Sequence, residues 1–227
     1  MTTKFNKKGR FASNPVVIAF EGMDYAGKST MIETIRKKIA DTGRRPPKVF
    51  AEPRKDTEEW RQIREMIISP NVPKLSQVYL SVAQRVTLYN EVILPELRQR
   101  RSVITDRCFL TSMVYQHSDS FNWIDIFWAN YYSTNTMGNI NQLRQPIPDI
   151  IVFMGISHAT YMERLGKDRD TVEHIETHIS DPEVFQEFSD RYHESLKFMD
   201  GMDKPVIIES NDPDEIYERL KELGCDF

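Results

Sequence analysis

Short apolar runs alternate along this chain with longer segments in which apolar residues recur every three or four positions. The short runs are typical of buried parallel strands, and the longer segments are typical of amphipathic helices. Strands are predicted at 16–20, 48–51, 102–105, 150–154 and 205–209. Their alternation with helical segments predicts an α/β fold in three layers (α/β/α), with a central five-stranded parallel sheet. Ligands of such sheets bind beyond the carboxyl ends of the strands, so the residues after each strand are the first candidates for a functional site.

The segment 75–97 has a long helical pattern, and one basic residue, Arg85, lies on or near its apolar side. A buried arginine needs an anionic partner or a route to water. Its position alone leaves a ligand-binding role and a structural role equally open. Pro95 is expected to kink or end this helix. The aromatic segment 121–137 is predicted to be a helix packed on the sheet or on a partner subunit.

A glycine-containing loop joins the first predicted strand to the first predicted helix. Residues 22–29 match the phosphate-loop pattern G-x-x-x-x-G-K-[ST] at every fixed position. Gly22 and Gly27 let backbone N–H groups point inward at anionic oxygens, and the helix adds its positive N-terminal end. The loop predicts a P-loop NTPase-like fold that binds ATP, with Lys28 on the terminal phosphates and Ser29 as a ligand of Mg²⁺. The predicted phosphate-binding residues are Gly22, Tyr25, Ala26, Gly27, Lys28, Ser29 and Thr30.

Charged residues follow the second, third and fourth predicted strands. Glu52 is either a residue of the ligand cleft or part of an exposed turn. Asp106 can hold Mg²⁺ and Arg107 can clamp a phosphate, although an internal Asp–Arg pair is the alternative. Arg164 and Arg169 belong either to a mobile lid over the phosphates or to a solvated charged turn.

Composition limits the kind of protein further. The 227 residues carry a net charge of −4, so no global basic field argues for nucleic acid as a partner. No apolar run approaches the ~20 residues of a membrane span. Two cysteines without zinc-type spacing are compatible with a reducing, cytoplasmic setting. We expect residues 1–14 to form a disordered basic tail and residues 15–227 to form a single domain, with a lid at about 160–178.

Three motifs together resemble the thymidylate kinases, a family of P-loop nucleoside-monophosphate kinases, over about residues 16–223. The first is the phosphate loop from Phe20 to Thr30, with Asp24 two residues after its first glycine. The second is Glu52-Pro53, and the third runs from Asp106-Arg107 through Thr111-Ser112 to Tyr115-Gln116. The resemblance implies phosphorylation of a pyrimidine deoxynucleoside monophosphate, dTMP to dTDP, by a homodimer that uses ATP and Mg²⁺.

The resemblance also implies roles for individual residues. Asp24 would face the sugar and phosphate of the acceptor, and Arg107 would hold that phosphate. Ser112 would contact the base, and the ring of Tyr115 would crowd the 2′ position and favour deoxyribose. The implied catalytic residues are Lys28, Arg107, Arg164 and Arg169; the implied substrate-binding residues are Asp24, Glu52, Arg54, Arg85, Arg107, Ser112, Tyr115 and Gln116; the implied metal ligands are Ser29 and Asp106.

Two positions depart from the family pattern in ways that matter for the substrate. Ser81 stands where the family usually has a phenylalanine that stacks on thymine, which leaves the acceptor base open. Tyr79, Trp60 or Phe109 could supply that platform instead. Arg54 stands where the family has a glycine, so it is a candidate for an extra phosphate contact.

Two other functions stay open at this point. A deoxynucleoside kinase starts from a neutral 5′-hydroxyl and needs a carboxylate base, a role that Glu52 would fit. A P-loop protein that binds or hydrolyses nucleotide as a switch needs no acceptor site. The basic residues expected on the acceptor side favour an enzyme that holds two phosphorylated substrates at once.

Overall fold

The computed structural model describes residues 9–12, 14–119, 121–133, 147–167, 173–202 and 205–225. All five predicted strands are confirmed, with ends shifted by at most one residue: β1 (Val17–Glu21), β2 (Lys48–Ala51), β3 (Val103–Asp106), β4 (Ile150–Phe153) and β5 (Val206–Glu209). The helices of the described residues are α1 (Lys28–Asp41), α2 (Glu58–Ile68), α3 (Lys74–Leu88), the π-helical segment η1 (Tyr89–Ile93), α4 (Leu94–Arg98), α5 (Phe109–Tyr115), α6 (Trp123–Ser133), α7 (His158–Arg164), α8 (His174–Ile179), α9 (Pro182–Asp200) and α10 (Pro213–Glu222).

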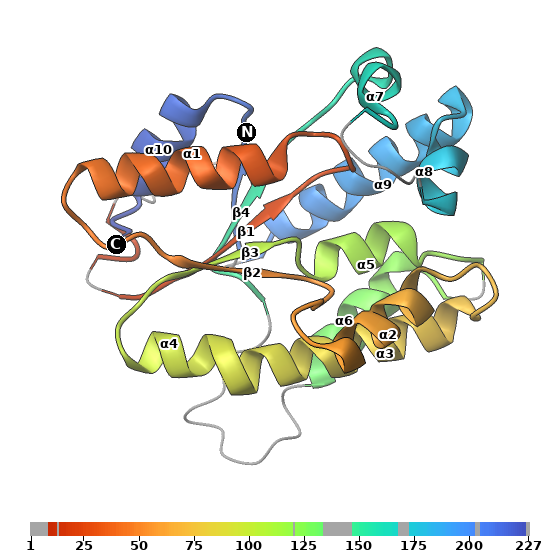
Figure 1. Cartoon of the computed structure of the whole chain (residues 1–227), viewed down its shortest axis with the longest axis horizontal. Helices are drawn as coiled ribbons and strands as arrows, with labels where there is room; N and C mark the ends of the chain where they lie inside the picture. The colour runs from red at the N-terminus through yellow and green to blue at the C-terminus, as the bar shows by residue number, and fades with distance from the viewer. Residues whose placement is uncertain are drawn as a thin grey trace.

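The strands form one parallel sheet in the order β2-β3-β1-β4-β5 (Figure 1). β1 is central, with β3 on one side and β4 on the other. The strand order therefore reverses at β1, and this is the point where open α/β sheets bind ligands. Phe20 of β1 pairs in register with Asp106 of β3, so the phosphate loop and the Asp106-Arg107 pair begin at the same edge of the sheet.

The two faces of the sheet are covered by different helices. Ile18 and Phe20 of β1 pack with α1 and α10 in a cluster that includes Ile35. Ala19 faces the opposite way and packs with residues of α3, α5, α6 and α9, because alternate residues of a strand point to opposite faces. Figure 1 shows α1 and α10 above the sheet and the run from α3 to α4 below it. The predicted three-layer architecture is confirmed.

The long helix predicted at 75–97 is present, but Pro95 does not end it. α3, η1 and α4 follow one another without a break, and the helical run stops only after Arg98. Pro95 has no N–H to donate to the preceding turn. The π-helical turn ends at Ile93, two residues before Pro95, so the irregularity that proline imposes is accommodated there and the helix continues.

Residues 9–12 belong to the segment expected to be a tail, yet they pack against the end of α10. The N–H of Gly9 donates to the carbonyl of Glu222 at 2.7 Å, and that of Phe11 donates to the carbonyl of Leu223 at 2.8 Å. The Phe11 ring is buried in the cluster shared by α1 and α10. The expectation of disorder therefore does not hold for residues 9–12, and residues 1–8 and 13 lie outside the described part of the chain.

Within the described ranges, no helix combines the length and the apolar character that a membrane crossing requires.

Candidate active site

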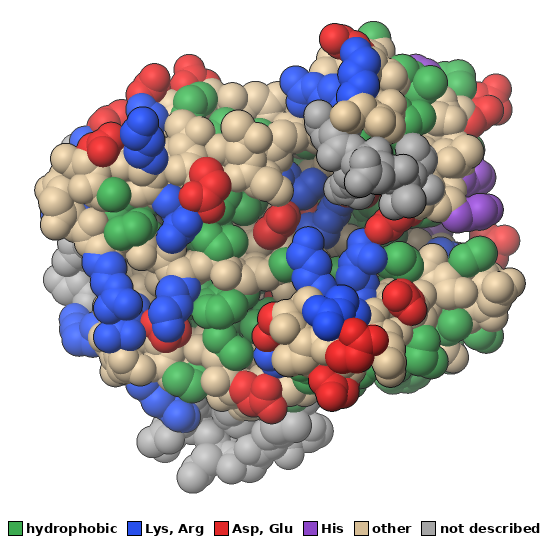
Figure 2. Space-filling view, in the orientation of Figure 1, with side chains coloured by type: hydrophobic (Ala, Val, Ile, Leu, Met, Phe, Trp, Pro, Cys, Tyr) green, Lys and Arg blue, Asp and Glu red, His purple; other side chains and the backbone are tan. Residues whose placement is uncertain are grey.

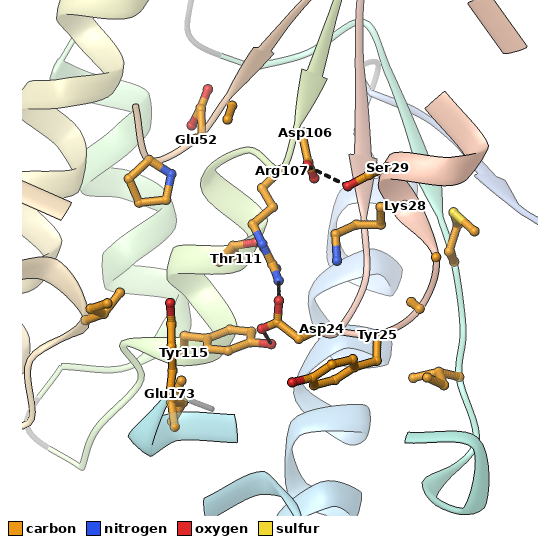
Figure 3. A pocket seen from close by; sticks show the side chains of 18 of the residues that line it. Asp24, Tyr25, Lys28, Ser29, Glu52, Asp106, Arg107, Thr111, Tyr115 and Glu173 are labelled. Carbon is orange, nitrogen blue, oxygen red and sulfur yellow. Dashed lines mark hydrogen bonds and ion pairs between the residues drawn. The ribbon is translucent and has the colours of Figure 1, made fainter. Parts of the chain in front are cut away.

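A cleft of about 1410 Å³ lies at the carboxyl edge of the sheet (Figures 2 and 3). Residues 24–31 line one side, and residues that follow β2 and β3, together with α2 and the start of α3, line the other. Single-ligand pockets usually measure about 300–1,000 Å³, so this cleft has room for two nucleotides. Figure 2 shows Lys and Arg side chains gathered around the hollow. The described cations that line it are Lys28, Lys55, Arg64, Lys74, Arg107 and Arg164.

The phosphate loop has a backbone that requires glycine at its first position. Gly22 has φ of 138°, and a Cβ there would lie 2.3 Å from the carbonyl oxygen of Met154. Gly27, with φ of 90°, is the N-cap of α1. Such turns point successive N–H groups at one anion. Gly22 itself packs against Met154 and does not line the cleft. The other predicted phosphate-binding residues do line it: Tyr25, Ala26, Gly27, Lys28, Ser29 and Thr30.

Lys28 is the buried cation of the loop, with only 7% of its surface exposed. Its Nζ donates to the carbonyl oxygens of Gly22 at 2.9 Å and Met23 at 2.8 Å. Burial, reinforced by the neighbouring charge of Arg107, lowers the pKa of Lys28 to about 8. These carbonyl dipoles stabilise an ammonium less than a phosphate would, so the side chain is poised for an anionic ligand.

Ser29 and Asp106 lie side by side, as the sequence predicts for two metal ligands (Figure 3). The Ser29 Oγ is 3.5 Å from Asp106 Oδ2, and Asp106 Oδ1 is buried without a hydrogen-bond partner among the described residues. A hydroxyl and a carboxylate with an unused oxygen are hard donors that suit Mg²⁺. The described residues hold no group of three or more His, Cys, Asp or Glu that could bind a metal. A metal at this position would therefore depend on phosphate oxygens for the rest of its shell.

Arg107 extends from the end of β3 toward the phosphate loop and pairs with Asp24 (Figure 3). Its Nη2 donates to Asp24 Oδ1 at 2.8 Å, and its Nη1 donates to the Gly22 carbonyl at 3.2 Å and to Thr111 Oγ1 at 3.1 Å. The guanidinium lies 5.5 Å from the centre of the Tyr115 ring, whose hydroxyl is 3.5 Å from Asp24 Oδ2. The structure thus brings Asp24, Arg107 and Tyr115 together beside the loop.

Glu21 was missed by the sequence reasoning, although it organises this group. Its carboxylate is completely buried at the end of β1. Oε1 accepts the N–H groups of Cys108 at 2.7 Å and Thr111 at 3.1 Å, and Oε2 accepts the Thr111 hydroxyl at 2.9 Å. Thr111 in turn accepts from Arg107, so Glu21 fixes the start of α5 and the guanidinium together. The available signal was a carboxylate ending an apolar strand, which is rarely buried without strong partners.

Arg85 and Glu52 form a buried ion pair beside the cleft. Arg85 Nε donates to Glu52 Oε2 at 2.5 Å, its Nη2 donates to Ser112 Oγ at 3.4 Å, and its Nη1 donates to the side-chain oxygen of Asn130. Burial raises the pKa of Glu52 even though Arg85 opposes the shift. Glu52 lines the main cleft and is only 5% exposed, which rules out the exposed turn. Arg85 and Ser112 line a smaller cavity beside the cleft.

Arg54 is not brought to the cleft, contrary to the idea of an extra phosphate contact. Its guanidinium pairs with Asp56 at 2.8 Å and with Glu91 at 3.0 Å, and it lies 5.0 Å from the centre of the Trp60 ring. Two of the hydrogen bonds of the Arg54 guanidinium go to the carboxylate of Asp56. Lys55, the residue after Arg54, lines the cleft instead.

The predicted lid region is described only in part. Arg164, at the end of α7, donates from Nη1 to the Tyr25 carbonyl at 2.8 Å and lines the cleft above the loop. Arg169 lies outside the described residues. Glu173, which caps the start of α8, pairs with Arg64 of α2 at 2.6 Å. This pair ties the later part of the predicted lid region to α2, on the opposite side of the cleft.

Three cations that line the cleft were not singled out from the sequence: Lys55, Arg64 and Lys74. Lys74 Nζ donates to the Tyr115 carbonyl at 2.9 Å, and burial lowers its pKa. The residues that flank them in the sequence are like those around ordinary exposed lysines and arginines, so the sequence pattern alone could not identify them as cleft residues. Gln116 was predicted and does line the cleft, with its Nε2 donating to Ser81 Oγ at 3.0 Å.

A phosphate loop with an arginine held beside it by Asp24, in a cleft with room for two nucleotides, is the arrangement of a P-loop nucleoside-monophosphate kinase. The sequence model of the thymidylate kinase family matches residues 20–219, and the chain belongs to that family. Among curated relatives, the thymidylate kinase of Thermosipho melanesiensis is 31% identical over 158 residues, which is 69% of this chain and 74% of that protein.

Two further comparisons agree. The thymidylate kinase of Leptospira borgpetersenii is 26% identical over 164 residues, 72% of this chain and 74% of that protein. The crystal structure of thymidylate kinase from Ehrlichia chaffeensis superposes with a TM-score of 0.63 at 16% identity, covering 92% of this chain and 98% of that one. At that identity the superposition supports the fold, and the family assignment rests on the sequence matches.

Proposed function

We propose that this protein transfers the γ-phosphoryl group of ATP to the 5′-phosphate of a pyrimidine deoxynucleoside monophosphate, converting dTMP to dTDP. The observation that supports this most is the position of Arg107, held by Asp24 and Thr111 directly beside the phosphate loop that carries Lys28. A guanidinium binds a phosphate bidentately, so this position suits the phosphate of a second substrate beside the donor.

The acceptor phosphate is already ionised at neutral pH, so the transfer needs no general base. The protein must instead hold two polyanions in line and neutralise their charge. Lys28 and the loop N–H groups bind the donor phosphates, and Arg107 binds the acceptor phosphate. Arg164 reaches the loop from α7 and neutralises the transferring group, together with Arg169 of the predicted lid. Tyr115 and Asp24, which contact Arg107, would then lie next to the sugar of the acceptor.

Mg²⁺ fits the pair formed by Ser29 Oγ and the unpartnered Asp106 Oδ1. When bound, it neutralises the charge that develops on the donor phosphate oxygens.

The assay compares dTMP and thymidine as acceptors, each with ATP and Mg²⁺. We expect dTDP from dTMP and no product from thymidine. Turnover of thymidine but not of dTMP would favour a deoxynucleoside kinase with Glu52 as base, since Glu52 lines the cleft. ATP hydrolysis that is indifferent to any acceptor would favour a switch or hydrolase.

A pair of variants on α1 links the activity to the loop. Lys28→Ala should abolish the transfer, because it removes the buried cation from the phosphate site. The matched control is Lys37→Ala, a change at an exposed position of the same helix, which should leave turnover unchanged. Equal turnover by the wild type and Lys28→Ala would remove Lys28 from the mechanism.

We also propose that the protein is a cytoplasmic homodimer. Ile124, Trp128 and Tyr132 are spaced by four residues along α6, and they are 39%, 38% and 57% exposed. Such an apolar helix face is typical of a subunit interface. Sedimentation should give a dimer for the wild type and a monomer for Trp128→Glu, and a wild-type monomer would contradict this proposal.

A further inference from the structure

A second, smaller cavity adjoins the acceptor side of the main cleft. It measures about 30 Å³, room for one or two water molecules. Five residues line both spaces, so the cavity opens from the cleft wall: Glu52, Pro53, Ile67, Thr111 and Gln116. Its size admits a small substituent of a bound molecule but not a ring.

The cavity is polar and contains an unused buried acceptor. Glu52 is 5% exposed; its Oε2 is taken by Arg85, but its Oε1 has no hydrogen-bond partner among the described residues. Gln116, 4% exposed, likewise leaves its Oε1 unpartnered within that part of the chain. A buried carboxylate oxygen left without a donor costs free energy, so the site favours an occupant that supplies an O–H or N–H.

Ser81 keeps this space open. Its hydroxyl accepts from Gln116 Nε2 at 3.0 Å, and it contributes to the cavity wall from α3 together with Gln84 and Arg85. A large side chain at this position would have to occupy the same space. Ser81 and the unpartnered oxygen of Glu52 are therefore parts of the same cavity.

The position of the cavity relates it to the acceptor base. With the acceptor phosphate at Arg107 and the sugar at Tyr115, the base must extend toward the cleft wall that is farther from the phosphate loop. That wall includes Glu52, Ile67 and Gln116, the residues that also line the small cavity. An edge of the base would thus face the cavity.

We infer that the cavity receives the hydroxyl of a 5-hydroxymethylpyrimidine, so that 5-hydroxymethyl-dUMP is a better acceptor than dTMP. The inference rests on the proposed monophosphate kinase function. The hydroxyl would donate to Glu52 Oε1, whereas the methyl group of thymine has no donor and would leave that oxygen unpaired. Arg85 carries only donors at this wall, which suits a carbonyl of a uracil ring better than the 4-amino group of cytosine.

The test is a panel of kcat/KM values for dUMP, dTMP, dCMP and 5-hydroxymethyl-dUMP with ATP and Mg²⁺. We expect the hydroxymethyl compound to exceed dTMP by about tenfold, because a site that hydrogen-bonds a substrate hydroxyl discriminates against the analogue without it. A ratio of one or less for the wild type would overturn the inference, as would a preference for dCMP. Failure of every monophosphate would instead refute the proposed function.

Variants then attribute the preference to the cavity. Ser81→Phe should fill the space and bring the ratio of the two kcat/KM values to one or below, while dTMP is still phosphorylated. The matched control is Ala83→Phe, which places the same ring at an exposed position of α3 and should keep the wild-type ratio. An unchanged ratio in Ser81→Phe would contradict the assignment. If that variant does not fold, Ser81→Val supplies the same comparison with a smaller group.

Discussion

The lowered pKa of Lys28 predicts that donor binding takes up a proton. The ammonium is buried against the Gly22 and Met23 carbonyls and its pKa is about 8. Donor phosphates would raise that pKa, since an opposite charge within a few ångströms favours the charged form. With a free pKa of about 8, the protons taken up per nucleotide are about 0.1 at pH 7, about 0.5 at pH 8 and about 0.9 at pH 9.

Isothermal titration calorimetry with ADP measures this number directly, in two buffers that differ in ionisation heat. Lys28→Arg is the matched control, because its guanidinium stays charged over the same range and should show no such uptake. The wild-type affinity should also fall by about fivefold between pH 8 and pH 9, as the fraction of charged lysine falls. Equal proton uptake by the wild type and Lys28→Arg at pH 8 and pH 9 would refute a buried, partly neutral lysine.

Three other predictions follow from the same geometry. The pKa of Lys28 in the folded protein, about 8, lies below the ordinary lysine value of 10.5, so the unfolded state binds more protons between pH 8 and 10.5. Denaturant titrations should therefore show the free energy of unfolding of the wild type rising by up to about 3 kcal/mol relative to Lys28→Met across that window; a constant difference would contradict the shift. Gly22→Ala should lower Tm and abolish ADP binding because its Cβ meets the Met154 carbonyl, whereas Gly155→Ala, with nothing within 4 Å, should leave Tm unchanged; equal melting curves would disprove the clash. Arg107→Ala should raise the KM for dTMP by about 10–100-fold, the loss of a charged hydrogen bond, and a change confined to the KM for ATP would argue against its acceptor role.

The fold and the donor half of the site could be predicted from the sequence because each rests on local patterns. The strands are short apolar runs, and the phosphate loop needs glycine where φ is positive, so both signals lie within a few neighbouring residues. The position of Asp106 beside Ser29 followed from the rule that parallel strands end at one edge of the sheet.

The acceptor half could not be predicted as well, because it depends on contacts between distant residues. Arg85 is buried by Glu52 and Asn130, which lie 33 and 45 residues away along the chain. From the sequence, Arg54 was a candidate phosphate-binding residue. In the folded chain its guanidinium donates to Glu91 instead, and Glu91 is distant in sequence. The spacing of apolar residues along the chain does not predict which of several carboxylates will pair with a given arginine.

We propose that the cleft holds two phosphorylated molecules at once, the donor at Lys28 and the acceptor at Arg107. A crystal structure with a bisubstrate analogue, thymidine and adenosine joined through a polyphosphate, tests it most directly. We predict that both nucleosides are ordered, with the polyphosphate contacting Lys28 and Arg107 and the thymine against the wall that contains Glu52 and Gln116. Density for only one nucleoside, with Arg107 still bound to Asp24 and making no phosphate contact, would contradict the account.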